Sequence, residues 1–275
     1  MLLYRILSGI VLIPIVLLII YYAHFYGFLA TIVLIEIIAF YELIKMSQTG
    51  SIKINKGFAF AGISLLAWHM VIPQKFIFTG LFLGCVFFIF THDLLKRMRF
   101  KSEFNTPVST LLKTVGVNFL SVIYIGWFLN YAVLLRKISP HMILFPLIIT
   151  WANDTGAYAI GRLFGKHKLA PKISPNKTWE GSIAGICSGM ITVAIFKFAV
   201  NGTKFFTDIS YAEFLLAGII ISIAGQIGDL FESYIKRKCK VKDSGNLIPG
   251  HGGLLDRIDS LIFSLPLTYY FFILI

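Results

Sequence analysis

Long apolar segments occupy most of this chain and restrict its fold more than any other feature. Of the 275 residues, 57% are hydrophobic and 14% are charged, and the mean hydropathy is +0.81. A soluble domain of this size could not hide so much apolar surface, so the composition predicts a polytopic protein that sits in a lipid bilayer. We mark nine apolar segments: Ile6–Tyr22, Phe28–Leu43, Phe58–Ile72, Phe76–Phe90, Leu111–Leu135, Met142–Ile160, Ile183–Val200, Phe214–Gln226 and Leu261–Ile275.

The length and continuity of these segments predict helices. A transmembrane helix needs about 20 apolar residues, so the shorter third, fourth, eighth and ninth segments are expected to lie partly at the interface. Only helices or closed barrels satisfy their backbone in lipid, and these runs do not alternate as barrel strands do. The first segment follows Arg5 without a cleavage site and is interpreted as an uncleaved helix. We therefore expect an all-α polytopic membrane protein with about nine transmembrane helices, in a range of seven to nine.

The distribution of positive charge predicts the orientation of these helices. The net charge is +12, from 25 Lys and Arg against 13 Asp and Glu. With the nine segments as drawn, the N-terminus and the even-numbered loops hold 20 of the 25 cations. By the positive-inside rule, the N-terminus and the polar loops face the cytoplasm and the C-terminus faces out. A soluble nucleic-acid binder is excluded by the apolar spans. The other side holds five cations: Lys75, Arg136, Lys137, Lys197 and Lys204.

Polar residues that could take part in a reaction are concentrated in the second half of the chain. We divide the chain into residues 1–140, expected to be scaffold, lipid groove or dimer surface, and residues 141–275, expected to be catalytic with polar loops 161–181 and 228–259. In the first half, Glu36 lies in mid-span and is either functional or a hydrogen-bonded structural carboxylate, so we assign it no role. Glu42 lies near the cytoplasmic end of the same helix.

The loop 228–259 combines five carboxylates with six Lys or Arg residues. Such a mixture beside apolar helices is costly unless the charges pair with each other, a metal or a ligand. If the eighth helix continues, Asp229, Ser233 and Lys236 share one face. Asp256 and Asp259 are three residues apart at the start of the last helix, and with Asp229 they offer hard oxygen ligands suited to Mg²⁺. The alternative is a solvated network in which Lys and Arg pair with these carboxylates.

The upstream loop adds hydroxyls and cations immediately before a predicted helix. Ser174, Lys177 and Thr178 precede it, and the amides and dipole of a helix N-terminus favour an anion. The alternative is a basic loop that only orients the protein. If the substrates are a nucleoside triphosphate and a lipid phosphate, the nucleophile is already anionic. His251 is then expected to donate a hydrogen bond to a substrate phosphate and not to act as a general base.

Both regions resemble the phosphatidate cytidylyltransferase (CDP-diacylglycerol synthase) family. The downstream match is Ser233, Lys236-Arg237, Lys242-Asp243, His251-Gly252-Gly253, Asp256-Arg257 and Asp259, with its spacing intact. The upstream matches are Asp154-Thr-Gly-Ala-Tyr158 and the run from Ser174 to Gly181. The specific match covers about 60 residues, and the remainder agrees only in length, charge and span count.

The resemblance implies transfer of a cytidylyl group from CTP to phosphatidate, giving CDP-diacylglycerol and pyrophosphate. It also implies a homodimer and a funnel open to the cytoplasm and the bilayer, in the inner membrane of a bacterium. Asp229 and Asp256 would be the lead Mg²⁺ ligands with Asp259 in support, and a monovalent cation such as K⁺ would fit beside them. Asp229, Asp256, Lys236 and Ser233 are the implied catalytic residues. Substrate binding is implied for Ser174, Lys177, Arg237, Lys242, His251 and Arg257.

Two other functions remain open from the residues alone. A CTP-dependent lipid or polyprenol kinase would share the cation-rich loops but would release CDP. A transporter for an anionic solute belongs to a different class and often shows repeated halves with broken helices at mid-membrane. Here the halves differ, and the polar residues crowd the cytoplasmic ends.

Overall fold

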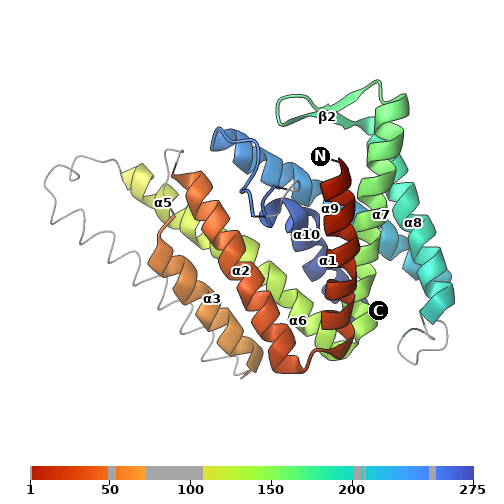
Figure 1. Cartoon of the computed structure of the whole chain (residues 1–275), viewed down its shortest axis with the longest axis horizontal. Helices are drawn as coiled ribbons and strands as arrows, with labels where there is room; N and C mark the ends of the chain where they lie inside the picture. The colour runs from red at the N-terminus through yellow and green to blue at the C-terminus, as the bar shows by residue number, and fades with distance from the viewer. Residues whose placement is uncertain (1, 49–53, 72–107, 201–205, 207–208, 248–251) are drawn as a thin grey trace, which may run out of the picture.

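The computed structural model describes residues 2–48, 54–71, 108–200, 206, 209–247 and 252–275, which form a helical bundle with a short hairpin at one end (Figure 1). In chain order the elements are α1 (Leu2–Tyr22), α2 (Phe25–Ser47), α3 (Lys56–Val71), α5 (Val108–Ser121), the π-helical segment η2 (Val122–Trp127), α6 (Phe128–Ile138), α7 (Pro140–Phe164), β1 (Lys168–Ala170), β2 (Ser174–Thr178), α8 (Trp179–Val200), α9 (Tyr211–Lys238) and α10 (Leu255–Leu274).

The helices confirm a polytopic membrane protein. Within the described residues, five helices are long and apolar enough to cross a bilayer. The predicted segment Phe76–Phe90 and the last residue of Phe58–Ile72 lie outside those residues. The five are Phe25–Ser47, Lys113–Ile138, Trp179–Val200, Tyr211–Lys238 and Leu255–Leu274.

Two helices extend well beyond the apolar segments marked in the sequence. α9 continues twelve residues past Gln226 to Lys238, and α10 begins at Leu255, six residues before the predicted start. Charged side chains end an apolar run without ending a helix, because they are carried out of the membrane on the same helical backbone. The eighth and ninth segments therefore belong to helices of 28 and 20 residues and are not short.

A two-stranded hairpin departs from the all-helical expectation. β1 and β2 are antiparallel, with Lys168 opposite Thr178 and Ala170 opposite Ser174. At its base, the backbone N–H of Trp179 donates to His167 O at 2.9 Å, and His167 Nδ1 lies 2.6 Å from Glu180 Oε1. These contacts join the hairpin to the first turn of α8 and fix its direction over the bundle end.

Glycines bring α8 unusually close to its neighbours. Gly181, Gly185 and Gly189 recur every four residues on α8, which packs most extensively against α7 and also against α9. A Cβ on Gly181 would lie 2.7 Å from Ala157 O of α7, and one on Gly189 would lie 2.1 Å from Ser222 Oγ of α9. Small residues allow this contact in a membrane, where close packing replaces the hydrophobic drive between helices.

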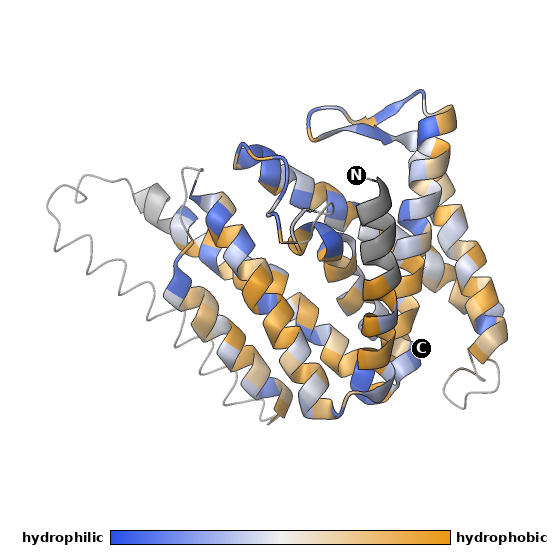
Figure 2. Ribbon diagram, viewed as in Figure 1, coloured by the Kyte–Doolittle hydropathy of each residue, from blue (hydrophilic) through white to orange (hydrophobic). Residues whose placement is uncertain are grey.

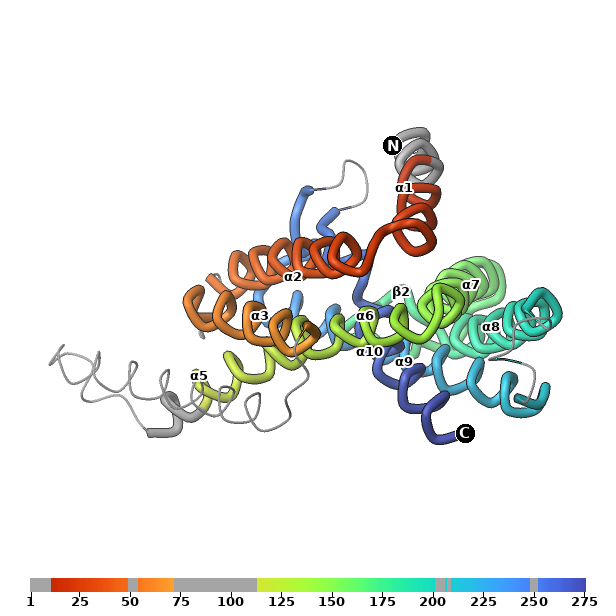
Figure 3. Tube along the Cα trace, turned by 90° about the horizontal axis from the view of Figure 1, so that it is seen from below, coloured from red at the N-terminus to blue at the C-terminus, as the bar shows by residue number. Residues whose placement is uncertain are grey.

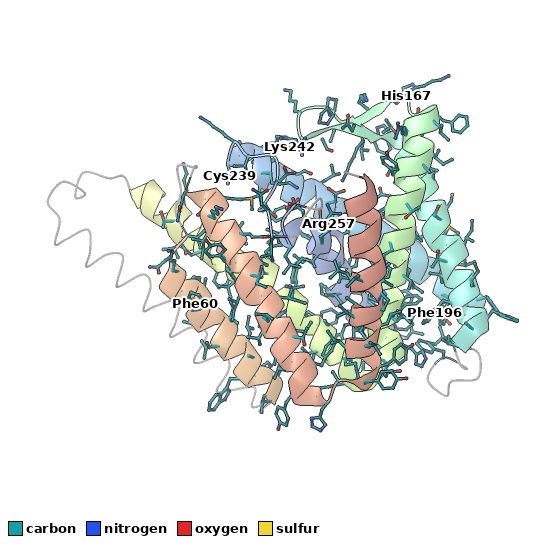
Figure 4. All side chains as sticks on the ribbon, viewed as in Figure 1. Phe60, His167, Phe196, Cys239, Lys242 and Arg257 are labelled. Atoms are coloured by element: carbon teal, nitrogen blue, oxygen red, sulfur yellow. The ribbon has the colours of Figure 1, made fainter. Side chains whose placement is uncertain are left out.

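The two ends of the bundle differ in chemistry. Hydrophilic residues gather at the end with the hairpin, and hydrophobic residues dominate the remainder (Figure 2). Toward the opposite end, aromatic rings of α8, α9 and α10 pack edge to face against Phe206; they are Phe196, labelled in Figure 4, Phe214 and Phe272. From below, α6 and α10 lie between α2 and α3 on one side and α7, α8 and α9 on the other (Figure 3).

Candidate active site

A cleft of about 770 Å³ lies at the polar end of the bundle, between α7, the hairpin, α8, α9 and the start of α10. Its charged lining contains as many cations as carboxylates. Any polyanionic ligand would make the site strongly negative unless these cations turned to it or further cations entered with it. The charged lining residues are Asp154, Asp229, Asp243, Asp256 and Asp259 with Arg162, Lys168, Lys177, Lys236 and Arg257.

Lys177 forms an ion pair that joins the hairpin to α9. Its Nζ lies 2.7 Å from Asp229 Oδ2, with about a quarter of the lysine side chain and a third of the aspartate side chain exposed. Lys177 lies on β2, immediately before Thr178 and the first residue of α8. The hairpin, which the sequence did not predict, is therefore what delivers this ammonium group to the cleft.

Lys236 connects α9 to α10. Its Nζ lies 2.6 Å from Asp256 Oδ1 and also pairs with the carboxylate of Glu232, one turn earlier on α9. Glu232 is completely buried, so Lys236 supplies the positive charge that such a carboxylate requires. The sequence contained Glu232 within the polar loop, but nothing in its spacing separated it from the other carboxylates.

Asp256 is held by the loop that precedes α10. Its Oδ2 accepts from Ser244 N, Ser244 Oγ and Gly253 N, each at 2.9 Å. Gly252 has a φ of +82°, a conformation that residues with a Cβ avoid. A Cβ there would also lie 2.9 Å from Asp256 Oδ2. Gly252 and Gly253 thus let the backbone wrap around this carboxylate.

Asp259 lies one turn further along α10 and is buried. Its Oδ1 accepts from Ser260 N at 2.7 Å. Asp229 and Asp154 line the same cleft. Its backbone carbonyl packs against Gly228 of α9, where an added Cβ would lie 2.4 Å from Asp259 O. The contact between Gly228 and Asp259 thus sets the separation of the two carboxylate-bearing helices.

Replacing Gly228 with alanine is expected to lower both stability and turnover. The nearest obstacle to the new methyl group is backbone, so α9 and α10 must move apart, at a cost of about 1–3 kcal/mol. The matched control is Gly116→Ala, since a Cβ at Gly116 of α5 meets nothing within 4 Å. Thermal unfolding and turnover in detergent would be measured for both. Equal behaviour of the two variants would contradict the tight contact.

A hydrogen-bonded polar group joins three helices beside the cleft. Gln226 Nε2 of α9 donates at 2.9 Å to Asn153 Oδ1 of α7 and at 2.9 Å to Ser182 O of α8. Ser182 Oγ in turn donates to Gln226 Oε1. All three residues line the cleft. The sequence did not predict this group, because two amides and a hydroxyl spread over 73 positions form no recognisable pattern.

The structure places the eleven predicted site residues in three groups. Lys177, Asp229, Lys236, Asp256, Arg257 and Asp259 line the cleft. Ser174, Ser233, Arg237 and Lys242 are absent from its lining, and His251 lies outside the described residues.

Two of the residues outside the lining make other contacts in the fold. Ser233 Oγ is 3.4 Å from Asp229 Oδ1, and Arg237 Nε donates to Ile173 O at 3.2 Å, which fastens the hairpin to the end of α9. Lys242 is exposed on the loop after α9, and Arg257, which lines the cleft, is also exposed (both are labelled in Figure 4).

The donor atoms of the cleft suit a hard divalent cation. Asp229, Asp256 and Asp259 all line the cleft, and their carboxylate oxygens are ligands of the kind that Mg²⁺ prefers. In the part of the chain that the structure describes, no three His, Cys, Asp or Glu side chains are gathered as a ligand set. Lys177 and Lys236 hold two of these carboxylates instead.

Comparison with known proteins gives one consistent family. A model described as "Cytidylyltransferase family" matches residues 3–275. A phosphatidate cytidylyltransferase of Bacillus subtilis (strain 168) is 33% identical over 244 residues, covering 85% of this chain and 84% of the relative. One from Staphylococcus aureus (strain COL) is 34% identical over 244 residues, covering 85% of each. One from Staphylococcus haemolyticus (strain JCSC1435) is 48% identical over 148 residues, 54% of this chain and 55% of the relative.

Proposed function

Because the chain belongs to the cytidylyltransferase family, it is a phosphatidate cytidylyltransferase of phospholipid synthesis, and we propose that it carries out the transfer in the cleft at the hairpin end of the bundle. One observation carries this proposal. Two lysines from different elements, Lys177 and Lys236, meet two carboxylates from different helices, Asp229 and Asp256, within a single cleft. These are the charges that a reaction between two phosphate-bearing substrates needs.

The reaction joins two anions and needs little proton transfer. A phosphate oxygen of phosphatidate attacks the α-phosphorus of CTP, the bond from that phosphorus to the bridging oxygen breaks, and pyrophosphate leaves. A phosphate monoester is already ionised near neutral pH, since its second pKa is about 6. The obstacle is repulsion, and preorganised cations lower it by neutralising the phosphates and aligning them.

The residues of the cleft fit these tasks. Lys177 comes from the hairpin and Arg257 from α10, and we assign both to the nucleotide phosphates. We assign Lys236 of α9 to the transferring phosphate. Ser233 is assigned a supporting role through its contact with Asp229. Ser174, Arg237 and Lys242 are assigned to the cleft entrance, and His251 remains a proposed phosphate contact.

Asp229, Asp256 and Asp259 would hold Mg²⁺, with a monovalent cation such as K⁺ beside it. When bound, Mg²⁺ would neutralise phosphate oxygens in the cleft. The lysines that pair with Asp229 and Asp256 would then become available to the substrate phosphates. This keeps the cleft close to electrical neutrality as each anion enters.

We further propose the orientation and organisation of the protein in the membrane. We propose about nine spans with a cytoplasmic N-terminus. The start of α1 lies at the same end of the bundle as the hairpin, while the C-terminus lies toward the other end, as an odd number of spans requires (Figure 1). CTP would enter from the cytoplasm and phosphatidate from the inner membrane of a bacterium. Residues 141–275 form the catalytic region, and residues 1–140 are scaffold and the surface of a homodimer.

The fate of labelled phosphate tests the proposed reaction. Purified protein in detergent would receive Mg²⁺, phosphatidate and CTP labelled at either the α or the γ phosphate. We expect the α label in the lipid product and the γ label in pyrophosphate. A γ label in the lipid, with release of CDP, would instead identify a kinase.

A further inference from the structure

Glu42 is an acidic residue of α2 that reaches the catalytic region from the first half of the chain. It is buried, with 4% of its surface exposed. Its Oε1 accepts from Leu254 N at 2.9 Å, and its Oε2 accepts from Leu255 N at 2.8 Å. Leu254 is the N-cap of α10 and Leu255 its first residue, so both amides lie at the helix N-terminus, where the helix dipole favours a negative charge. Glu42 therefore fixes the start of the helix that carries Asp256 and Asp259.

The backbone around Glu42 is shaped to receive its carboxylate. A Cβ on Gly245 would lie 2.6 Å from Glu42 Oε1, and a Cβ on Gly253 would lie 2.6 Å from Glu42 Oε2. Neither position can carry a side chain without displacing the carboxylate or the backbone. Gly245 and Gly253, both in the loop before α10, thus enclose the Glu42 side chain, which comes from α2.

Ser244 links Glu42 to Asp256. Its Oγ lies 3.1 Å from Glu42 Oε2 and 2.9 Å from Asp256 Oδ2, and its backbone N–H donates to the same oxygen of Asp256. A hydroxyl has one proton to donate, so the two carboxylates share it. Gly253 belongs to both groups, since its N–H donates to Asp256 while its Cα borders Glu42. The position of the Asp256 carboxylate therefore depends on Glu42 through two routes.

We infer that Glu42 is a positioning residue of the transferase. It holds the loop 243–245 and the first turn of α10 in the one arrangement that presents Asp256 to Lys236 and to the cleft. The inference rests on the proposed catalytic role of the cleft. It gives the first half of the chain a direct part in the site, in addition to that of scaffold.

A structural carboxylate of the same helix provides the matched control. Glu36 is completely buried on α2, and its Oε1 accepts from Asn130 Nδ2 of α6 at 2.6 Å. It does not line the cleft. If Glu42 only stabilises the fold, then Glu42→Gln and Glu36→Gln should behave alike. If Glu42 positions Asp256, the two should differ in turnover.

The test measures turnover and thermal unfolding for Glu42→Gln, Glu36→Gln, Ser244→Ala and the double variant Glu42→Gln with Ser244→Ala. We expect Glu42→Gln to lower kcat about 30-fold, as the loss of a charge-assisted hydrogen bond would. Its KM for CTP should change less than threefold, since the residue does not touch substrate. Its melting temperature should fall no further than that of Glu36→Gln, which should keep kcat within twofold.

The double variant separates positioning from independent effects. Because Ser244 transmits the effect of Glu42, kcat of the double variant should be no lower than that of the more impaired single variant. Losses that multiply, or a wild-type kcat in Glu42→Gln, would overturn the inference. Should Glu42→Gln fail to fold, Ser244→Ala decides, and an undiminished kcat in it would refute the link. Failure of the wild-type protein to transfer label would instead count against the proposed function.

Discussion

Asp256→Asn is expected to lower kcat about 10³-fold, the largest effect of any single change in the cleft, equivalent to roughly 4 kcal/mol of transition-state stabilisation. Oδ2 of Asp256 accepts three hydrogen bonds and Oδ1 pairs with Lys236. The asparagine side chain has only one accepting oxygen. Its NH2 group would face a group that now donates to Asp256, and that group would lose its hydrogen bond. Lys236 would keep Glu232 as its partner and would be drawn away from the cleft.

The loss should be one of catalysis and not of folding. The control is Glu213→Gln, which removes a carboxylate from the first turn of α9, at the other end of that helix. Glu213 completes a capping box with Ser210, and glutamine can still accept from the Ser210 N–H, so the change removes only a charge near the helix N-terminus, which should cost about 0.3–1 kcal/mol of stability and leave kcat unchanged. Turnover and unfolding would be measured on both purified variants. A kcat in Asp256→Asn within tenfold of wild type would remove Asp256 from the catalytic machinery.

Lys177→Met is expected to lower kcat/KM for CTP about 10²-fold, as the loss of one preorganised donor to a phosphate would. Methionine preserves much of the length of the side chain and removes its charge. Asp229 would lose its partner at 2.7 Å and would repel the incoming nucleotide. Both effects weaken nucleotide capture, so the KM for CTP should rise as well as kcat fall.

The matched control for Lys177 lies on the same hairpin. Lys172 is exposed between β1 and β2 and is absent from the cleft lining, so Lys172→Met removes the same charge without touching the site. Steady-state kinetics at several CTP concentrations would be compared. Similar losses in both variants would mean that the total charge of the hairpin matters, and not the placement of Lys177.

The spacing of the sequence predicted much of the site because the residues concerned lie on single helices. Asp229, Lys236, Asp256 and Asp259 occupy α9 and α10 as helical periodicity required. The partners of these residues were not predictable in the same way. Lys177 reaches Asp229 across 52 positions through a hairpin whose residues favour strand weakly, since SPNKT contains proline, asparagine and serine.

The contribution of Glu42 was not predicted for a related reason. Its partners lie 202 to 213 positions away, and a single carboxylate at the end of an apolar helix is equally consistent with an interfacial charge. Gly245 and Gly253 border the Glu42 carboxylate closely, but a glycine in a sequence does not identify what approaches it. Sequence periodicity describes one element, whereas the site is made by contacts between elements.

The contact between Glu42 and Leu254 has a consequence for how the protein is made. The two residues are 212 positions apart, so the ribosome synthesises α2 long before α10. Until α10 has entered the membrane beside α2, the loop that holds Asp256 lacks its fixed shape. From the proposed role of Asp256 we therefore expect that a partly inserted chain does not consume CTP, and that activity begins only when the helices of the two halves have come together.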